Sequence, residues 1–128
     1  MEKDVSDKDY RIEKDSMGEL KVPSVSHWGP QTQRAVENFQ ISQIKMPSDF
    51  IRSLALLKWA ISSANAELNL ISEEKAKVIG DVALKIAGGQ YSDEFPVDVF
   101  QTGSGTSTNM NMNEVIANLS STDELKIH

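Results

Sequence analysis

Apolar residues recur at helical spacing through the middle of this chain. After Pro47 they follow one another every three or four positions over about five helical turns, at Phe50, Leu54, Leu57, Ile61, Ala64 and Leu68. This pattern predicts a long helix from Ser48 to Leu68, with the Ser48 side chain as its N-terminal cap.

A second apolar line lies beside the first on this helix, at Ile51, Ala55, Trp59 and Ser62. Two such lines give the helix more apolar surface than one neighbouring helix can cover. Part of that surface is therefore expected to face something other than the next helix.

The following segment predicts a second helix that runs antiparallel to the first. It begins near Ser72 and ends at Gly88 and Gly89, because glycine commonly terminates helices. Its buried stripe is expected to consist of Val78, Ile79, Val82, Ala83 and Ile86. The two segments together predict a helical hairpin.

Shorter elements precede this hairpin. Two stretches, Tyr10–Glu13 and Glu19–Val22, surround a turn at Gly18 and predict a short β-hairpin or an extended arm. A short helix is expected after Gly29, with Pro30 in its first turn. The apolar side of this short helix is Ala35, Val36 and Phe39.

The C-terminal part combines a connection with one more helix. Residues 90–109 contain Pro96, glycines and many small polar side chains, which predict an ordered connection. Met110–Leu119 then regains helical character. We therefore expect a mainly α fold, with residues 1–9 as a flexible terminus and residues 10–128 as one domain.

Composition narrows the possible functions. The 128 residues carry a formal net charge of −6, and the basic residues are scattered, which argues against a nucleic-acid-binding surface. There are no cysteines and only two histidines, His27 and His128, so neither a thiolate site nor a metal cluster is expected. No signal peptide or membrane-spanning run is recognisable, and a cytoplasmic location without membrane contact is expected.

One stretch has the residue types for chemistry. Gly103 to Thr108 lies just before a predicted helix, where backbone N–H groups and the hydroxyls of Ser104 and Thr106 can converge on a carboxylate or phosphate. On these residues alone, the simpler interpretation is that Ser, Thr and Asn cap the helix and satisfy turn amides. The stretch is neither a Walker loop nor a dinucleotide fingerprint.

Three longer segments of the sequence resemble those of the fumarase and aspartase superfamily. They are RIEKDSMGELKVP (residues 11–23), WGPQTQRAVENFQIS (28–42) and DEFPVDVFQTGSGTSTNMNMNEVIAN (93–118). Trp28-Gly29 and the loop from Thr102 to Thr106 look like the versions found in class II fumarases, whereas aspartases usually have Tyr-Gly and a Gly-Ala-Gly-Thr loop. The chain therefore resembles the N-terminal domain of a class II fumarase most closely.

This resemblance implies roles for particular residues. In that family the matching Ser-Gly-Thr contacts a carboxylate of fumarate or malate, which places substrate binding on Ser104, Gly105 and Thr106. His128 matches the first residue of a His-Pro-Asn-Asp segment that forms a secondary anion site. Leu125 stands where the family often has an arginine, and this departure weakens the assignment of His128.

The resemblance also implies what this chain lacks. The family's central helical-bundle and C-terminal domains, with the catalytic motifs that follow His128, are not in the sequence, so no catalytic residue, metal or cofactor is assigned here. A fumarate hydratase of the tricarboxylic acid cycle is expected when full length, as a homotetramer, whereas this chain alone is expected to be inactive. The alternatives are an aspartase-type ammonia-lyase fragment and a non-catalytic helical interaction module.

Self-association is expected for the fragment itself, because its apolar surface is large. Two copies are expected either to pair through a two-fold contact or to exchange an element such as the C-terminal helix. Residues in or near the contact between two copies are expected to be Met110, Val115, Ile116 or Leu119.

Overall fold

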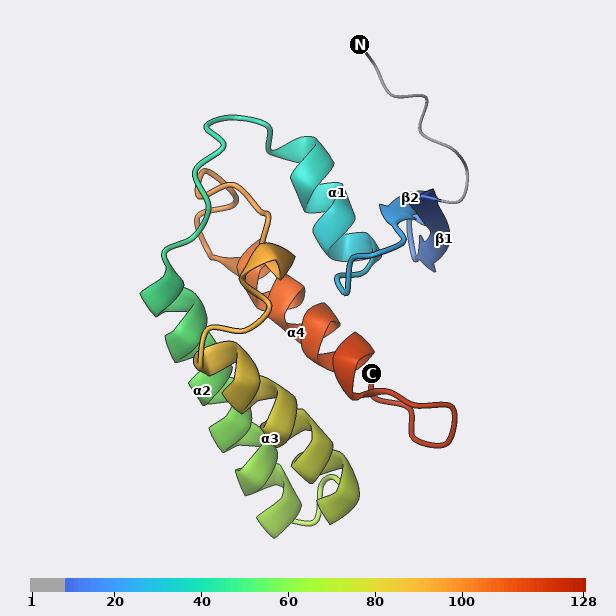
Figure 1. The fold of residues 1–128 in the computed structure, drawn as a ribbon, viewed down its shortest axis with the longest axis vertical. Helices are drawn as coiled ribbons and strands as arrows, with labels where there is room; N and C mark the ends of the chain where they lie inside the picture. Colours follow the sequence, from blue (N-terminus) through green and yellow to red (C-terminus); the bar gives the residue numbers. More distant parts are fainter. Residues whose placement is uncertain (1–8) are drawn as a thin grey trace.

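The computed structural model describes residues 9–128, and in this range the chain forms a β-hairpin and four α-helices (Figure 1). The strands are β1 (Tyr10–Asp15) and β2 (Gly18–Pro23). The helices are α1 (Pro30–Asn38), α2 (Ser48–Glu67), α3 (Glu73–Ala87) and α4 (Thr106–Ser120). The predicted mainly α fold and the N-terminal hairpin are confirmed. The expected flexible terminus falls on residues 1–8, outside the described range, and on Asp9.

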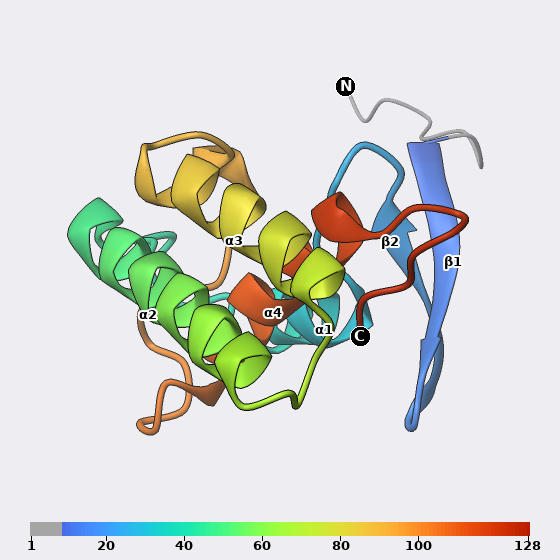
Figure 2. The same ribbon diagram turned by 90° about the horizontal axis from the view of Figure 1, so that it is seen from below.

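Helix α4 lies in the middle of the fold. The antiparallel pair of α2 and α3 packs on one side of it, and α1 with the β-hairpin lies on the other side (Figures 1 and 2). Buried side chains therefore occur on several faces of α4, and they are Thr108, Asn111, Met112, Val115, Ile116 and Ser120. Position in the middle of the fold makes α4 the element that connects the other parts.

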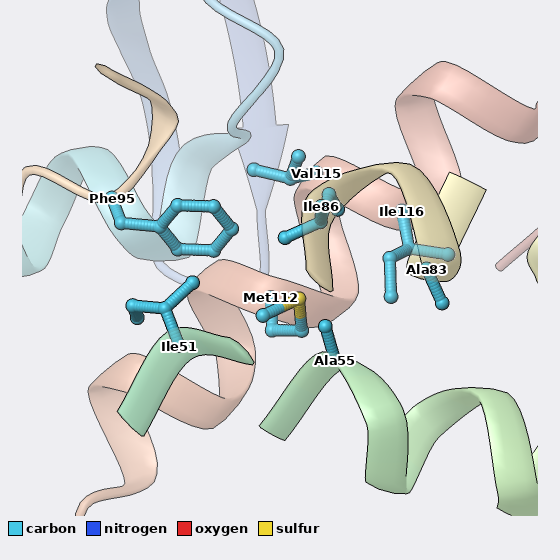
Figure 3. Packing of buried hydrophobic residues seen from close by; sticks show 8 residues of the cluster. All are labelled: Ile51, Ala55, Ala83, Ile86, Phe95, Met112, Val115 and Ile116. Atoms are coloured by element: carbon cyan, nitrogen blue, oxygen red, sulfur yellow. The ribbon is translucent and has the colours of Figure 1, made fainter. Parts of the chain in front are cut away.

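The apolar core fills the space between α2, α3 and α4 (Figure 3). Met112 and Val115 of α4 are fully buried there, against Ala55 of α2 and Ala83 of α3. Small residues on α2 and α3 allow the two helices to lie close to α4. Four residues of the predicted stripe of α3 are confirmed, because Ala83 and Ile86 are buried and Ile79 and Val82 pack against the same cluster, whereas Val78 is only partly buried and outside it.

The two apolar lines of α2 have different surroundings. The buried line contains Ile51, Ala55 and Ser62, the second line recognised in the sequence. The line with the stronger periodicity is largely exposed: Phe50 is 45%, Leu57 53%, Ile61 44% and Leu68 67% accessible. Trp59 lies against Gly80 of α3 and remains 41% exposed. The expectation that one helical neighbour cannot cover α2 is confirmed within residues 9–128.

The prediction of which residues form a contact between two copies is wrong for Val115 and Ile116. Val115 and Ile116 belong to the core of the single chain, with exposures of 0% and 5%. They point toward α2 and α3 because α4 is covered from that side (Figure 3). Val115 and Ile116 therefore offer no surface to a second copy, whereas Met110 and Leu119 are partly exposed.

Two helix starts differ from the sequence-based prediction. Ser48 is the first helical residue of α2 and not its cap, because Pro47 occupies the cap position and makes no side-chain hydrogen bond there. Helix α4 begins at Thr106, four residues before the predicted Met110. Its cap is Gly105, which adopts a left-handed conformation with φ of 73°. A helix start formed by backbone geometry alone has no apolar periodicity. This explains why the predicted start lies four residues after the observed one.

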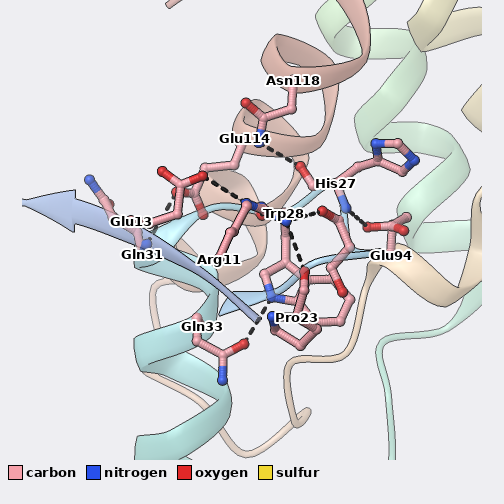
Figure 4. A network of polar contacts seen from close by, with 11 residues as sticks. Arg11, Glu13, Pro23, His27, Trp28, Gln31, Gln33, Glu94, Glu114 and Asn118 are labelled. Atoms are coloured by element: carbon pink, nitrogen blue, oxygen red, sulfur yellow. Dashed lines mark hydrogen bonds and ion pairs between the residues drawn. The ribbon is translucent and has the colours of Figure 1, made fainter. Parts of the chain in front are cut away.

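Polar side chains attach the β-hairpin and α1 to the rest of the fold (Figure 4). Arg11 of β1 donates to the carbonyl oxygens of Pro23 (2.8 Å), Ser26 (2.6 Å) and Trp28. One guanidinium thereby shapes the segment that leads from β2 into α1, since its fixed fork of donors suits several acceptors at once.

Glu114 of α4 acts as the N-terminal cap of α1. Its carboxylate accepts from the backbone N–H groups of Gln31 (3.1 Å) and Thr32 (2.7 Å) and from the Thr32 hydroxyl (2.6 Å). A carboxylate is favourable at this position because helix N-termini carry partial positive charge. A Cβ at Gly29 would collide with this carboxylate, so glycine is needed there for the close approach.

A bidentate ion pair joins the turn of the β-hairpin to α1. Arg34 Nε and Nη2 donate to the two oxygens of Asp15 at 2.8 and 2.9 Å. The Arg34 hydrogen bond holds the pKa of Asp15 below its usual range.

In residues 9–128, no helix has both the length and the apolar character that crossing a bilayer requires.

Candidate functional site

The loop before α4 is shaped by one tight turn. The Gly105 N–H donates to the Thr102 carbonyl at 3.1 Å, which closes a turn over Gly103 and Ser104. Gly105 then takes its left-handed conformation, which glycine adopts without steric cost. The loop residues Gly103 and Ser104 are exposed, as is Thr106.

Backbone donors of the first turn of α4 are available at this loop. Among residues 9–128, the N–H groups of Thr106 and Ser107 have no hydrogen-bond partner, as expected for the first residues of a helix. Added Cβ atoms at Gly103 and Gly105 would meet no atom within 4 Å, so the space over the loop is open. An anion can therefore approach the helix N-terminus closely.

The hydroxyls of Ser104 and Thr106 do not cap the helix. Their oxygen atoms lie 2.9 Å apart and share a hydrogen bond. No side chain forms an N-terminal cap of α4. The simpler interpretation of these residues as helix caps is therefore wrong for Ser104 and Thr106, and both hydroxyls are held at the surface next to the free amides.

A side-chain amide spans the base of the loop. Gln101 Oε1 accepts from the Thr108 N–H at 2.9 Å, and Gln101 Nε2 donates to the Thr108 hydroxyl at 2.7 Å and to the Asp98 carbonyl at 3.1 Å. At the start of α4, both the N–H and the hydroxyl of Thr108 therefore have hydrogen-bond partners, and Thr108 is only 2% exposed.

The segment that leads into the loop is fixed by Asp98. Its buried carboxylate accepts from the N–H groups of Ser42 (2.6 Å), Gln43 (3.1 Å) and Phe100 (2.8 Å), and from the Ser42 hydroxyl (2.9 Å). These hydrogen bonds to its charged form hold the pKa of Asp98 far below its usual range, although burial acts in the opposite direction.

One lysine lies beside α4 near the loop. Lys58 of α2 donates from Nζ to Asn109 Oδ1 at 2.6 Å. Partial burial lowers the pKa of this lysine from its usual value. Asn109 is on the first turn of α4 and its N–H donates to the Gly105 carbonyl at 3.1 Å, so the ammonium adds positive charge close to the loop.

His128 lies at a different surface. It is exposed and lines a depression of about 400 Å³ between α2, α3, α4 and the C-terminal segment, together with Lys58. His27 has a structural place: its N–H donates to Glu94 Oε2 at 2.7 Å, its carbonyl accepts from Asn118, and its ring packs edge-on against Tyr91. Within residues 9–128, no cluster of three potential metal ligands occurs.

Sequence reasoning missed the residues that support the loop. Gln101, Thr108 and Asp98 were read as parts of a connection, and Lys58 was not singled out. The signal for Asp98 was its carboxylate between Val97 and Val99, an unusual polar position in an otherwise apolar stretch. Its partners, residues 41–43, lie more than 50 positions earlier, with separations of 55 to 57.

The arrangement can bind an anion, but it cannot by itself perform acid-base chemistry. Free amides, two hydroxyls and a nearby ammonium all favour negative charge. Within the described residues, no carboxylate or imidazole contacts Ser104 or Thr106, so the loop has no partner for proton removal. Stabilisation of a carboxylate is the chemical task that this site can serve.

This chain is similar to known lyases. A sequence model of the protein family described as lyase matches residues 18–128. The class II fumarate hydratase of Xylella fastidiosa (strain Temecula1) is 57% identical over 120 residues, which cover 93% of this chain and 25% of the relative. That of Mycobacterium tuberculosis (strain H37Rv) is 51% identical over 125 residues, which cover 98% of this chain and 26% of the relative.

Solved structures have the same fold. The crystal structure of recombinant class II fumarase from Schistosoma mansoni matches with a TM-score of 0.85 and 37% identity, over 88% of this chain and 24% of that chain. The native form of fumarate lyase:delta crystallin from Brucella melitensis matches with a TM-score of 0.84 and 43% identity, over 87% of this chain and 26% of that chain. This chain thus spans about a quarter of the length of such relatives.

Proposed function

This chain belongs to the lyase family, and on that premise we propose that it is the N-terminal part of a class II fumarate hydratase. The complete enzyme reversibly hydrates fumarate to (S)-malate in the tricarboxylic acid cycle, and it needs no metal or cofactor. The unit that contributes to this activity comprises residues 10–128. The proposal retains the cytoplasmic location expected from the sequence.

The observation that carries the proposal is the open N-terminus of α4. Free N–H groups at Thr106 and Ser107 and the hydroxyls of Ser104 and Thr106 lie together at the open start of α4, where we place a substrate carboxylate. The N-terminal end of the helix dipole favours this negative charge. Gly105 permits both the turn and the close approach of the carboxylate.

The reaction needs more than this loop. Hydration and dehydration of a dicarboxylate require a base that removes the proton alpha to one carboxylate and a site that stabilises the resulting aci-carboxylate. Ser104, Gly105 and Thr106 serve the binding of a carboxylate. The base belongs to the remaining three quarters of the length that the relatives have. We therefore expect the 128-residue chain alone to be inactive and the full-length protein to work as a homotetramer.

His128 enters the proposal as part of a secondary anion site. Its support is the exposed position at a depression that also contains the Lys58 ammonium. Anion binding at this position is tested by titrating malate into the chain while the His128 ring signals are followed by NMR. A His128→Ala variant identifies those signals.

A chimaera tests the proposed activity. Residues 1–128 replace the matching part of the Xylella fastidiosa enzyme, and the hydration of fumarate is measured. We expect turnover in the chimaera and none in the 128-residue chain. Ser104→Ala and Thr106→Ala are each expected to weaken transition-state stabilisation by about 1–3 kcal/mol, the scale for a hydrogen bond to a charged group. Ser53→Ala, at an exposed hydroxyl of α2, is the control.

The alternatives give different results in the same experiment. Deamination of aspartate by the chimaera in place of fumarate hydration would assign the chain to an ammonia-lyase. An inactive but tetrameric chimaera would favour a non-catalytic interaction module. Unchanged kcat/KM in both the Ser104→Ala and Thr106→Ala variants would show that the loop does not bind substrate.

A further inference from the structure

The loop from Thr102 to Ser107 is fixed at its two ends and not at Ser104 and Thr106. The oxygen atoms of Ser104 and Thr106 share a hydrogen bond of 2.9 Å, and within residues 9–128 their side chains make no other hydrogen bond. The six residues from Thr102 to Ser107 lie between Gln101 and Thr108, whose side chains are directly joined. The shape of the loop therefore depends on how these two residues are connected.

The connection between Gln101 and Thr108 has three hydrogen bonds. The Gln101 oxygen accepts from the Thr108 N–H (2.9 Å) and from the Thr108 hydroxyl (3.0 Å), and the Gln101 nitrogen donates to the same hydroxyl (2.7 Å). Amide and hydroxyl each act as both donor and acceptor, so the pairing satisfies both groups. It closes the loop in the way that a backbone pair closes a hairpin.

Each end of this connection is anchored in the fold. Thr108 is part of α4, next to Asn111, whose Nδ2 donates to the Glu94 carbonyl at 2.8 Å. Gln101 follows Asp98, whose carboxylate binds the backbone of residues 41–43 and whose carbonyl accepts from Gln101 Nε2 at 3.1 Å. The Val99 N–H also donates to the Ile44 carbonyl at 2.9 Å. Both stems of the loop are thus fixed while its tip stays open.

We propose that Gln101 and Thr108 are positioning residues that preorganise the Ser104-Gly105-Thr106 loop for a substrate carboxylate. This inference rests on the proposed function. Neither residue touches the substrate. Their pairing keeps the two hydroxyls and the free amides of α4 directed at one space before the substrate arrives, so that the substrate does not have to order the loop.

Preorganisation has a kinetic signature that a purely structural role lacks. When the competent loop conformation is populated only in part, the apparent affinity falls by that fraction. The cost is the same for the bound ground state and the transition state, so KM rises while kcat is retained. Ser104→Ala instead removes a contact to the reacting carboxylate. It therefore lowers kcat/KM, and kcat can fall as well.

Matched variants in the chimaera test the proposal. Thr108→Val keeps the volume and removes the hydroxyl, whereas Thr108→Ser keeps the hydroxyl. We expect Thr108→Val and Gln101→Ala to raise KM for fumarate about 10-fold with kcat changed by less than about 3-fold. Thr108→Ser is expected to stay close to the parent. Gln101→Glu keeps the acceptor for the Thr108 N–H and is expected to fall between the parent and Gln101→Ala.

The outcomes separate this inference from the proposed function. An unchanged KM in both Gln101→Ala and Thr108→Val, with reduced kcat/KM in Ser104→Ala and Thr106→Ala, overturns the positioning role and leaves substrate binding in place. Unchanged kinetics in all four variants refute substrate binding by the loop, and the positioning role with it.

A second measurement covers the case in which a chimaeric variant fails to assemble. Backbone NMR order parameters are compared between the 128-residue chain and its Gln101→Ala variant. We expect lower order parameters at residues 103–106 in the variant and unchanged values in α2 and α3. Equal values at residues 103–106 in both proteins overturn the proposal.

Discussion

Two sides of α4 are held by different kinds of interaction. Toward α2 and α3 the contacts are apolar, with Met112 and Val115 completely buried (Figure 3). Toward α1 and the segment before it the contacts are hydrogen bonds: the Glu114 carboxylate accepts from backbone N–H groups of α1, and Asn118 donates to the His27 carbonyl (Figure 4). Long helices supply enough apolar area to pack by burial, whereas short elements supply little and are attached through their unpaired backbone groups.

Substitutions on the two sides of α4 are therefore expected to destabilise the fold for different reasons. On the apolar side, a substitution lowers the free energy of unfolding in proportion to the buried volume that it removes. On the polar side, it lowers the free energy of unfolding because backbone groups lose a charged hydrogen-bond partner.

The largest effect is expected on the apolar side, at Met112. Met112→Ala should lower the free energy of unfolding by about 2–5 kcal/mol, because it leaves a cavity in the centre of the core. Urea denaturation followed by circular dichroism measures this. The matched control is Met17→Ala, since Met17 is 78% exposed in the hairpin turn. Equal midpoints for the two variants would contradict the central role of Met112.

The next effect is expected on the polar side, at Glu114. Glu114→Gln keeps the shape and removes the charge that accepts from two N–H groups and one hydroxyl of α1. We expect the free energy of unfolding to fall by about 1–3 kcal/mol, the range for hydrogen bonds to a charged group. Glu124→Gln, at an exposed position, is the control. Stability equal to the parent would show that the cap of α1 needs no charge.

A third effect appears only in acid and concerns Asp98. Its folded-state pKa is lowered, so its stabilising contribution is present above the unfolded-state pKa of about 4 and is lost as the pH falls below that value. Unfolding free energy measured between pH 7 and pH 2 should therefore decline below pH 4 less steeply in Asp98→Asn than in the parent. Identical slopes would mean that Asp98 is not charged in the folded state.

The smallest effect on folding is expected at the exposed line of α2, where we place the self-association of the fragment. Leu57→Gln should change the free energy of unfolding by less than about 0.5 kcal/mol, as is usual for exposed positions. The same change should lower the average mass in light scattering at high concentration, because Leu57 is 53% exposed between Phe50 and Ile61. A parent chain that stays monomeric at every concentration would refute this surface.

Elements with a repeated apolar pattern were predicted well from the sequence. The helical hairpin of α2 and α3 was recognised with nearly its observed bounds, and Ser72 caps α3 as expected, accepting from the Lys75 N–H at 3.2 Å. The residues of the candidate loop were also recognised, through the anion-binding chemistry of a helix start and the resemblance to fumarases. Burial periodicity and local capping are properties of neighbouring residues, so a sequence can display them.

Other features depended on residues that are far apart in the chain. Glu114 and Thr32 are separated by 82 positions, and Asp98 and Ser42 by 56, so no local pattern joins them. Which of the two apolar lines of α2 is buried was likewise decided by the position of α4 and not by the strength of the periodicity.

The sequence alone determined that the chain is mainly helical, and it predicted that Ser104, Gly105 and Thr106 form a loop for a carboxylate. Only the tertiary structure decided which surfaces face each other and which side chains hold that loop. The physical reason is that backbone preferences and amphipathic spacing act within a few residues, whereas the partners of Gln101, Asp98 and Glu114 are selected by packing of the whole fold around α4.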